Sequence, residues 1–477
     1  MIVAEGDLYM NFADVRFWGI LAASLLAILM IRLVVVKIMR PDPGHYDRAA
    51  LAIMGLVLLG CVSLLSLGIF AAVSVTTYLG LHLILKTDSS QKRRAKWLWL
   101  LIPLQLSPLL FYKYGGFLEN EILGLQSRSF TNVLIPVGIS FYTFQLISFA
   151  VDTLKLSQPL PSPLNTLNFA GFFPQIVAGP IERREALLPQ LQNFRFRWDK
   201  KAIETGLTWI ILGLFFKRCL ADNLALTPLA HSGINPFLVW LDTMMFGFRI
   251  YFDFCGYSLM ALGVAQCLGI GLTLNFRSPY GASNIADFWR RWHVTLSTWF
   301  RDYIYLPLGG SCTGFWTANI LIVFVISGIW HGAGWNFLIW GGMHGFFLLV
   351  YRFPMKVNLP RAVGFLLTHF CVFLAWLCFY ETDTQELFRK LGLLLNPASY
   401  DGLAVRSFIA ACLSPNGLDV FGILGIVACV ISLEMWSLRK EGEPYRFLRT
   451  RGAAAILIFL TVILSPISNN DFIYFAF

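Results

Sequence analysis

The residue best placed for chemistry is His331, in the run WHGAGW over residues 330–335. The stretches on both sides are apolar enough to lie in a membrane, where an ionisable side chain is expensive and therefore a functional hypothesis by default. Gly332 and Gly334 remove side chains beside the imidazole, so a substrate or a neighbouring helix can approach it closely. The alternative is a neutral imidazole that bonds a helix carbonyl and braces a helix bundle. We favour the functional role.

A second histidine, His293, follows two arginines in the run DFWRRWHVTLS, residues 287–297. In a functional interpretation, Arg290 and Arg291 bind the phosphates of a cofactor or a lipid headgroup, because a guanidinium group matches phosphate geometry. In the alternative, His293 is one polar residue of a basic interfacial patch. The sequence leaves both interpretations open. Arg301 and Asp302 follow closely, and we expect them to pair with each other for structure.

Other polar residues in apolar runs have simpler explanations. Asp253 is a lone carboxylate among aromatic residues, so it must be paired, protonated or directed at a polar cavity. We expect structural pairing ahead of a direct chemical role. His344 is expected to pack. The nine cysteines form no C-x-x-C pair, and P-loop, H-E-x-x-H and G-x-S-x-G motifs are absent, so the sequence predicts no metal site, ATP hydrolysis or serine-hydrolase chemistry.

The elements that position these residues follow from composition. The chain has 477 residues, of which 57% are hydrophobic and 13% are charged. A soluble domain carries about 25% charged residues. A chain this long and apolar lacks the polar residues to cover its surface in water. The sequence therefore predicts an all-α polytopic integral membrane protein.

Apolar runs long enough for membrane helices recur along the chain. With about 20 residues needed for one span, we expect about 11 to 13 membrane helices. The run 49–85 is too long for one span and should form a helical hairpin. Gly341 and Gly345 form a small-xxx-small face expected to pack against another helix. The candidate spans are residues 17–36, 49–67, 68–85, 97–112, 133–151, 203–220, 236–252, 258–274, 316–330, 335–351, 363–379, 420–437 and 453–465.

The distribution of charged residues predicts how the protein is oriented in the membrane. The formal net charge is +10, with basic residues in short runs between apolar segments. This is the bias of cytoplasmic loops in membrane proteins, so nucleic acid is not an expected partner. Arg32, Lys37 and Arg40 close the first span, and acidic residues precede it. We therefore expect the N-terminus outside the cytoplasm.

Two stretches break the pattern of spans. Residues 162–191 are apolar but interrupted by prolines and glycines, which predicts a re-entrant or interfacial segment. Residues 275–314 are too polar to span a membrane and too aromatic for a free loop. Their interleaved tryptophans and arginines favour an interfacial helix.

Four motifs together carry a resemblance to a known family. The run 287–310 resembles the signature of membrane-bound O-acyltransferases, and WHGAGW with WGGMHG at 340–345 is similar to their histidine motif. PQIVAGPI at 174–181 and the ending FIYFAF at 472–477 also match. The bacterial branch that contains the alginate O-acetylation membrane protein is the most similar. This branch also includes proteins that acetylate cellulose or peptidoglycan and the D-alanyl transfer protein of teichoic acids.

The resemblance implies one all-helical membrane domain over residues 1–477 around a central cavity. Its parts are N-terminal helices at 1–132, a catalytic core at 133–352 and C-terminal helices at 353–477. His331 matches the catalytic histidine of the family, and His293 matches its second polar position. A neutral imidazole serves as general base near neutral pH, and His293 or Asn336 is assigned to stabilise the oxyanion. Substrate or donor binding is assigned to Arg290, Arg291, Trp330, Asn336 and Asp253.

The resemblance also implies substrates and partners. The acyl donor is acetyl-CoA or an acyl carrier thioester, with no bound cofactor. The acceptor is an exported polysaccharide or an extracytoplasmic acetyltransferase, at a bacterial inner membrane whose lipid surrounds the protein. Peptidoglycan, teichoic acid or a lipid is the alternative acceptor. From other classes, a transporter or flippase with a histidine relay and an inactive scaffold remain alternatives.

Overall fold

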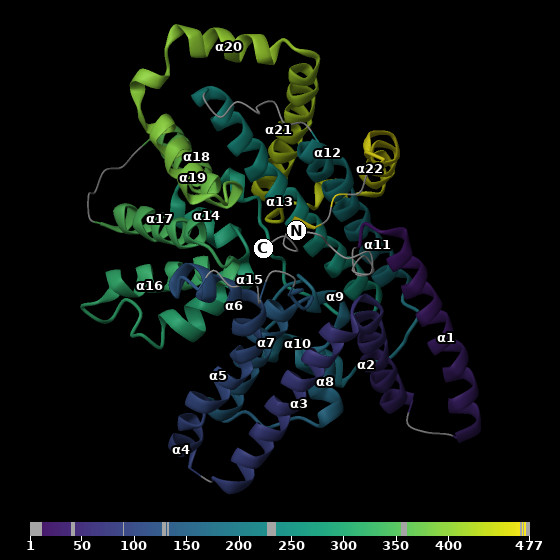
Figure 1. The fold of residues 1–477 in the computed structure, drawn as a ribbon. Helices are drawn as coiled ribbons and strands as arrows, with labels where there is room; N and C mark the ends of the chain where they lie inside the picture. The colour runs from purple at the N-terminus through teal and green to yellow at the C-terminus, as the bar shows by residue number, and fades with distance from the viewer. Residues whose placement is uncertain are drawn as a thin grey trace. The chain divides into compact units, whose positions relative to one another are not determined.

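The computed structural model describes residues 12–39, 43–88, 90–125, 130, 133–226, 235–353, 360–467, 470 and 472–473. Over these residues the regular secondary structure is helical, and there is no strand (Figure 1). The predicted all-α class is therefore confirmed. His331, His293 and the other candidate residues all lie in the described ranges, whereas positions 474–477 of the final motif lie outside them.

The described chain divides into two compact units, Met1–Ile210 with Met260–Thr273, and Ile211–Leu259 with Leu274–Phe477. Two boundaries between these units fall within helices, in Lys200–Leu214 and in Pro236–Cys267. The first unit contains α1 (Val15–Met39), α2 (Pro43–Val62), α3 (Leu64–Thr87), α4 (Gln91–Lys96), α5 (Leu98–Leu109), α6 (Gly115–Phe117), α7 (Ile139–Leu154), α8 (Pro163–Ala170), α9 (Phe173–Ile176), α10 (Arg184–Gln192) and most of α11 (Lys200–Leu214).

The second unit holds the two candidate histidines. Two of its segments, η3 and η5, are π-helical, a rare geometry that is frequent at functional sites. The unit contains η3 (Phe215–Ala221), α12 (Asp222–Leu226), most of α13 (Pro236–Cys267), η4 (Pro279–Gly281), α14 (Ile285–Arg291), α15 (Val294–Phe300), η5 (Arg301–Tyr305), α16 (Trp316–His331), α17 (Trp335–Arg352), α18 (Arg361–Tyr380), α19 (Thr384–Leu395), α20 (Gly402–Cys412), α21 (Pro415–Glu441) and α22 (Arg451–Leu464).

Five described helices are long and apolar enough to cross a membrane: α1, α2, α3, α18 and α21. Shorter apolar helices are α7, α16, α20 and α22. Large apolar side chains on these helices face outward, such as Leu33 on α1 and Val462 on α22. Exposed apolar surface of this extent suits lipid rather than water. Other expected spans fall on α5, α11, α13 and α17.

Two expectations about local structure are confirmed. The apolar run 49–85 is broken at Ser63, whose side chain caps α3 by accepting from the backbone N–H of Ser66. Residues 162–191 form no straight helix but the short helices α8 and α9 and all of α10 except its last residue, because prolines recur through them.

One expectation is wrong. Residues 236–252 and 258–274 do not form two spans, because α13 runs unbroken from Pro236 to Cys267. Gly256 lies inside this helix, and a Cβ there would meet the Gly213 carbonyl oxygen at 2.8 Å. The glycine therefore permits close packing against α11 instead of breaking the helix.

A tight glycine interface joins α16 to α17 and fixes the helix that ends at His331. A Cβ on Gly341 would lie 2.3 Å from the Phe324 carbonyl oxygen, and one on Gly328 would lie 2.2 Å from that of Phe337. A Cβ on Gly345 would meet the Leu321 side chain at 3.0 Å. Gly341 and Gly345 pack against α16, as expected.

This interface generates a prediction. Gly341→Ala should destabilise the protein by about 1–3 kcal/mol, because the added methyl group meets backbone that cannot move without shifting α16. Thermal unfolding of the purified protein in detergent measures the change. The matched control is Gly342→Ala on the same helix, where no atom lies within 4 Å of the new Cβ. Equal melting temperatures for the two variants would contradict the close packing.

Candidate active site

His331 ends α16 in an aromatic pocket. Its side chain is buried, with 4% of the residue exposed. The imidazole centroid lies 4.8 Å from Trp330, 5.0 Å from Trp340 and 5.2 Å from Phe379. The chain leaves the helix at once, because Gly332 is extended. A Cβ on Gly332 would meet the Phe337 ring at 2.0 Å, so this glycine lets α17 pack beside the histidine.

His293 occupies the break between α14 and α15. Its φ of 42° lies in the left-handed region, which is strained for a residue with a side chain and is a conformation that occurs often at functional sites. Only 1% of the residue is exposed. Because burial removes water from the charged form, the pKa of His293 falls from its ordinary value to about 3. The imidazole is therefore neutral at physiological pH.

Asn275 selects the tautomer of His293. The Asn275 Oδ1 atom accepts from the Thr295 hydroxyl at 2.6 Å and from the Thr295 N–H at 3.3 Å, so this atom is the amide oxygen. The His293 Nδ1 atom lies 3.3 Å from the same oxygen and must carry the hydrogen. The Nε2 atom of neutral His293 is then an acceptor, and it is buried with no hydrogen-bond partner among the described residues.

The two histidines meet at one tryptophan. The Trp330 ring lies 6.2 Å from the His293 ring and 4.8 Å from the His331 ring, measured between centroids. The structure therefore brings together three residues that the sequence singled out. They come from the α14–α15 break and from the end of α16.

Asn336, Asp253 and Arg291 each form a hydrogen bond or an ion pair, whereas Arg290 is exposed. Asn336, in the first turn of α17, donates through Nδ2 to the Cys378 carbonyl oxygen of α18 at 2.9 Å. Asp253 forms an ion pair of 2.7 Å with Lys217. Arg291 pairs with Asp287 at 2.9 Å, while 71% of the Arg290 side chain is exposed.

Arg290 lines a cavity of about 400 Å³. Arg301 and Arg352 also line it, although Arg301 pairs with Asp302 at 2.7 Å as expected. The Nη1 atom of Arg352 lies 3.5 Å from the Tyr305 hydroxyl. Arg352 was not among the site residues predicted from the sequence, in which it is marked only as a basic residue at the end of an apolar run. The apolar walls comprise Val294, Leu296, Phe300, Ile320, Val323, Phe324 and Leu348.

We call this the arginine cavity, after Arg290, Arg301 and Arg352. Two of its lining residues are close in sequence to the histidines. Its lining includes Val294, which follows His293, and Ser327, which lies one helical turn before His331. Apolar walls with a few polar groups are typical of small-molecule sites, and this volume is within their usual range of roughly 300–1,000 Å³. The arrangement suits an anionic ligand with an apolar portion.

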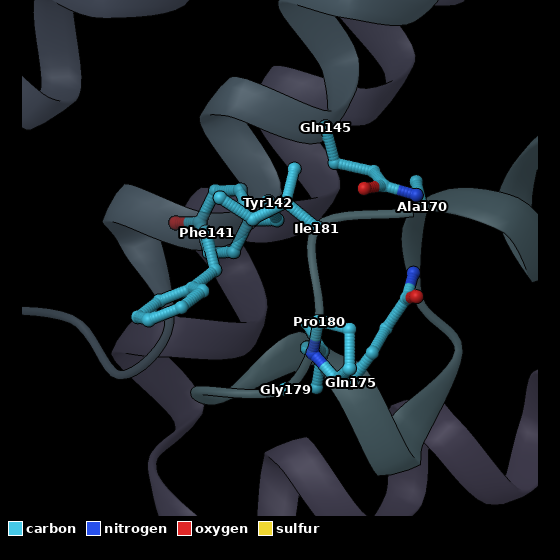
Figure 2. Close-up of a pocket in the computed structure, with 9 residues that line it drawn as sticks. Phe141, Tyr142, Gln145, Ala170, Gln175, Gly179, Pro180 and Ile181 are labelled. Atoms are coloured by element: carbon cyan, nitrogen blue, oxygen red, sulfur yellow. The ribbon is translucent and has the colours of Figure 1, made fainter. Parts of the chain in front are cut away.

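A second, much smaller cavity lies in the first unit (Figure 2). Its volume of about 10 Å³ is close to the minimum for one water molecule. The PQIVAGPI motif provides part of its lining through Gln175, Gly179 and Pro180, opposite Tyr142 and Gln145 of α7. The Tyr142 hydroxyl is buried and has no hydrogen-bond partner among the described residues.

Membrane-spanning helices with a buried histidine pair define a multi-pass integral membrane protein with a candidate catalytic centre. The model of the membrane-bound O-acyltransferase (MBOAT) family matches residues 58–378, more than half of the chain. The chain belongs to this family and is an O-acyltransferase family enzyme.

Three relatives illustrate the range of acceptors. The chain is 31% identical over 446 residues to the probable alginate O-acetylase AlgI of Pseudomonas putida, covering 86% of this chain and 90% of that protein. It is 34% identical over 351 residues to the peptidoglycan O-acetyltransferase of Helicobacter pylori, covering 64% and 66%. It is also 34% identical over 251 residues to the teichoic acid D-alanyltransferase of Bacillus subtilis, covering 48% and 61%.

The role of Asn275 can be tested by its removal. Asn275→Ala should destabilise the protein by about 1–3 kcal/mol, because the His293 imidazole and Thr295 lose a buried acceptor. Thermal unfolding in detergent reports the loss, and Asn193→Ala, which removes an exposed hydrogen bond, should leave the melting temperature nearly unchanged. An Asn275→Ala variant as stable as the parent would argue against the assigned tautomer.

The small cavity yields another expectation. Tyr142→Phe should change stability by less than about 1 kcal/mol, because the deleted hydroxyl has no protein partner to lose. Tyr46→Phe in the same unit deletes a hydroxyl that donates to the Ile28 carbonyl and should cost about 0.5–1.5 kcal/mol. Unfolding curves of both variants decide the matter. A larger loss from Tyr142→Phe than from Tyr46→Phe would reveal an ordered partner in the cavity.

Proposed function

We propose that this protein transfers an acetyl group from a cytoplasmic thioester to a hydroxyl group of an exported polysaccharide, with His331 as the general base. The observation that carries this proposal is that the buried His331 and His293 both lie near Trp330, and that Ser327 and Val294, which are close to them in sequence, line the arginine cavity. The alternative acceptor is an extracytoplasmic partner protein that carries the acetyl group onward.

The reaction requires little from the protein beyond base catalysis and charge stabilisation, because a thioester is already activated. The hydroxyl oxygen of the acceptor attacks the thioester carbonyl while the His331 imidazole takes the hydroxyl proton. The tetrahedral intermediate then collapses, its C–S bond breaks, and the thiolate takes the proton from the imidazolium. An ester and a thiol are the products, and His331 returns to its neutral form.

His293 serves as an acceptor in this scheme. With Nδ1 hydrogen-bonded to Asn275, its Nε2 atom offers a lone pair and no proton. This favours a contact with a donor, such as a substrate hydroxyl or the amide N–H of a pantetheine arm. It argues against the oxyanion role considered from the sequence. Asn336 retains one amide hydrogen beside its bond to Cys378, so it stays the candidate oxyanion donor.

The donor is proposed to bind in the arginine cavity. Arg290, Arg301 and Arg352 would contact the phosphates of acetyl-CoA or of a carrier-bound phosphopantetheine, because Arg forms bidentate bonds with phosphate. The apolar walls would contact the chain that leads to the thioester. The proposed setting is a bacterial inner membrane, with the N-terminus outside and the donor entering from the cytoplasm.

An alginate-like polysaccharide is the favoured acceptor, because the likeness to the AlgI protein of Pseudomonas putida extends over nearly all of both chains. Peptidoglycan is the second candidate, supported by the 34% identity to the Helicobacter pylori enzyme. Expression in an alginate-producing strain and in a peptidoglycan-acetylating strain, each lacking its own MBOAT protein, would separate the two by the restored O-acetyl ester.

His331→Ala tests the chemistry. Loss of a general base should reduce acetyl transfer by about 10²–10⁴-fold. The measurement is O-acetyl ester content of the polymer in cells and consumption of labelled acetyl-CoA by the purified protein. His45→Ala, which alters an exposed histidine, is the control with parental activity. Parental acetylation by His331→Ala at equal expression would refute the proposed role.

The donor site has its own test. Arg290→Gln and Arg352→Gln should each raise the KM for acetyl-CoA roughly tenfold with little change in kcat, because a phosphate contact is shared by the bound substrate and the transition state. Arg389→Gln, on an exposed pair with Glu386 in α19, is the matched control. If both cavity variants keep the parental KM for acetyl-CoA and for an acetylated carrier protein, the cavity does not bind the donor.

A further inference from the structure

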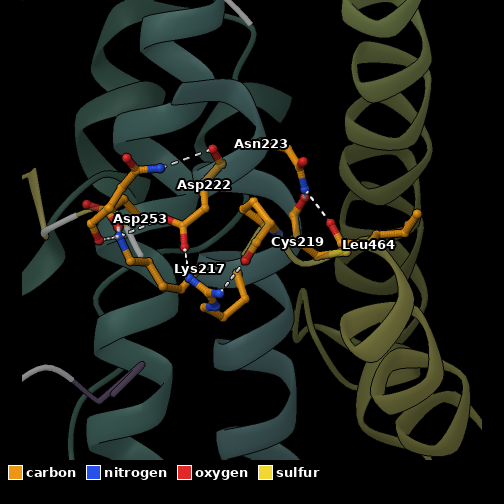
Figure 3. A network of polar contacts seen from close by, with 9 residues as sticks. Lys217, Cys219, Asp222, Asn223, Asp253 and Leu464 are labelled. Carbon is orange, nitrogen blue, oxygen red and sulfur yellow. Dashed lines mark hydrogen bonds and ion pairs between the residues drawn. The ribbon is translucent and has the colours of Figure 1, made fainter. Parts of the chain in front are cut away.

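Pro466, Asn470 and Ile473, which follow α22, contact a buried ion cluster. This ion cluster is formed by Lys217, Arg218, Asp222 and Asp253 (Figure 3). The Lys217 side chain is 4% exposed, and the two carboxylates are 1% and 2% exposed. With two cations and two carboxylates, the cluster is electrically neutral. None of these residues is used in the proposed acyl transfer.

The Lys217 ammonium group contacts two carboxylates and one backbone carbonyl. Its Nζ atom lies 2.7 Å from Asp253 Oδ1 and 3.0 Å from Asp222 Oδ1. It also donates to the Asn470 carbonyl oxygen at 3.0 Å. An ammonium group has three donors and no acceptor, so the Asn470 carbonyl oxygen is a suitable partner beside the two carboxylates. The ion cluster is therefore incomplete without the residues after α22.

The other contacts of the ion cluster also reach this segment through its backbone. Arg218 donates to the Pro466 carbonyl oxygen at 2.7 Å and pairs with Asp222 at 2.7 Å. Asp253 Oδ2 accepts from the Ile473 N–H at 2.6 Å. Next to the cluster, Asn223 donates to the Leu464 carbonyl oxygen at 2.8 Å, as Figure 3 shows. Backbone contacts at both ends fix where the segment lies.

A stabilising role alone does not explain such a cluster. Removing ions from water costs several kcal/mol per ion, and apolar residues of equal size often stabilise a core as well or better. Buried ion pairs do specify geometry, because each partner accepts only a few arrangements. The ion cluster is therefore best understood as a device that defines the position of residues 470, 472 and 473.

Phe472 links this segment to the active site. Its ring stacks on Tyr257, with centroids 4.8 Å apart and planes inclined by 26°, and lies 5.9 Å from the Phe254 ring. Phe254 in turn lies edge-on to the His293 imidazole, with centroids 4.7 Å apart. The His293 imidazole thus packs against a ring, Phe254, that Phe472 in turn contacts.

His293 needs such support. Among the described residues, its side chain forms a 3.3 Å contact with Asn275, and its Nε2 atom has no partner. One hydrogen bond restrains rotation of an imidazole weakly, whereas catalysis requires orientation within about 10–20°. Packing against Phe254 supplies the missing restraint.

We propose that the ion cluster and Phe472 are a positioning device that sets the orientation of the His293 imidazole through Phe254. The inference rests on the proposed acyl transfer and adds positioning residues to it. Phe472, Asp253 and Lys217 act through other side chains and contact no substrate. Disturbing them should therefore reduce the turnover of bound substrate and leave donor binding intact.

The experiment compares variants reconstituted in nanodiscs, with labelled acetyl-CoA as donor and the same isolated polysaccharide as acceptor. Phe472→Ala should lower kcat at least tenfold while KM for acetyl-CoA stays within twofold of the parent. Phe472→Trp, which retains an aromatic ring, should recover most of the loss. Phe459→Ala on the exposed face of α22 is the matched control and should keep the parental kcat.

Asp253→Asn provides a second test that does not depend on the ring. Asparagine preserves the side-chain shape and can still accept from Ile473, but it removes a charge from Lys217, so a several-fold loss of kcat at unchanged KM is expected. This variant decides the question if Phe472→Ala does not fold. Melting temperatures and gel filtration establish that the compared proteins are folded.

The outcomes are distinguishable. Parental kcat in folded Phe472→Ala or Asp253→Asn would overturn the positioning role, and so would a raised KM with unchanged kcat. Activity of His331→Ala equal to the parent would instead overturn the proposed function itself. A loss of kcat in Phe472→Ala that Phe472→Trp restores supports the inference.

Discussion

The structure depends on the need of every polar group at membrane depth to find a partner within the protein, because lipid offers none. The ion cluster shows how far this requirement reaches, since it joins η3, α12, α13 and the backbone after α22. Asn336 of α17 satisfies the same requirement with one hydrogen bond, which it donates to a backbone carbonyl of α18. These contacts determine which helices lie beside one another in the second unit.

The candidate active site departs from this rule in a specific manner. His293 is held in a strained backbone conformation, is kept neutral by burial, and presents an Nε2 atom that has no partner among the described residues. Strain and an unmatched polar atom are costly, and both tend to occur where chemistry requires them. The Trp330 ring lies near His293 at the end of α16, which also carries His331, and Val294, the residue after His293, lines the arginine cavity.

The glycine interface and the ion cluster have complementary effects on the two histidines. Gly328 and Gly341 bring α16 and α17 together closely enough to fix the helix end that bears His331. The ion cluster fixes the residues whose packing supports His293. The glycine interface acts through the absence of side chains, and the ion cluster acts through the pairing of charges. Both give rigid support to a histidine that must be oriented.

The sequence by itself determined the membrane class and the family, singled out His331 and His293, and favoured structural pairing of Asp253, because hydropathy and motifs are local properties of the chain. It did not identify Lys217 as the partner, the continuity of α13, or the meeting of Arg352 with Arg290 in one cavity. Those features depend on how helices distant in sequence pack together. Only the tertiary structure decides them, because partner choice and helix continuity arise from contacts that no local pattern encodes.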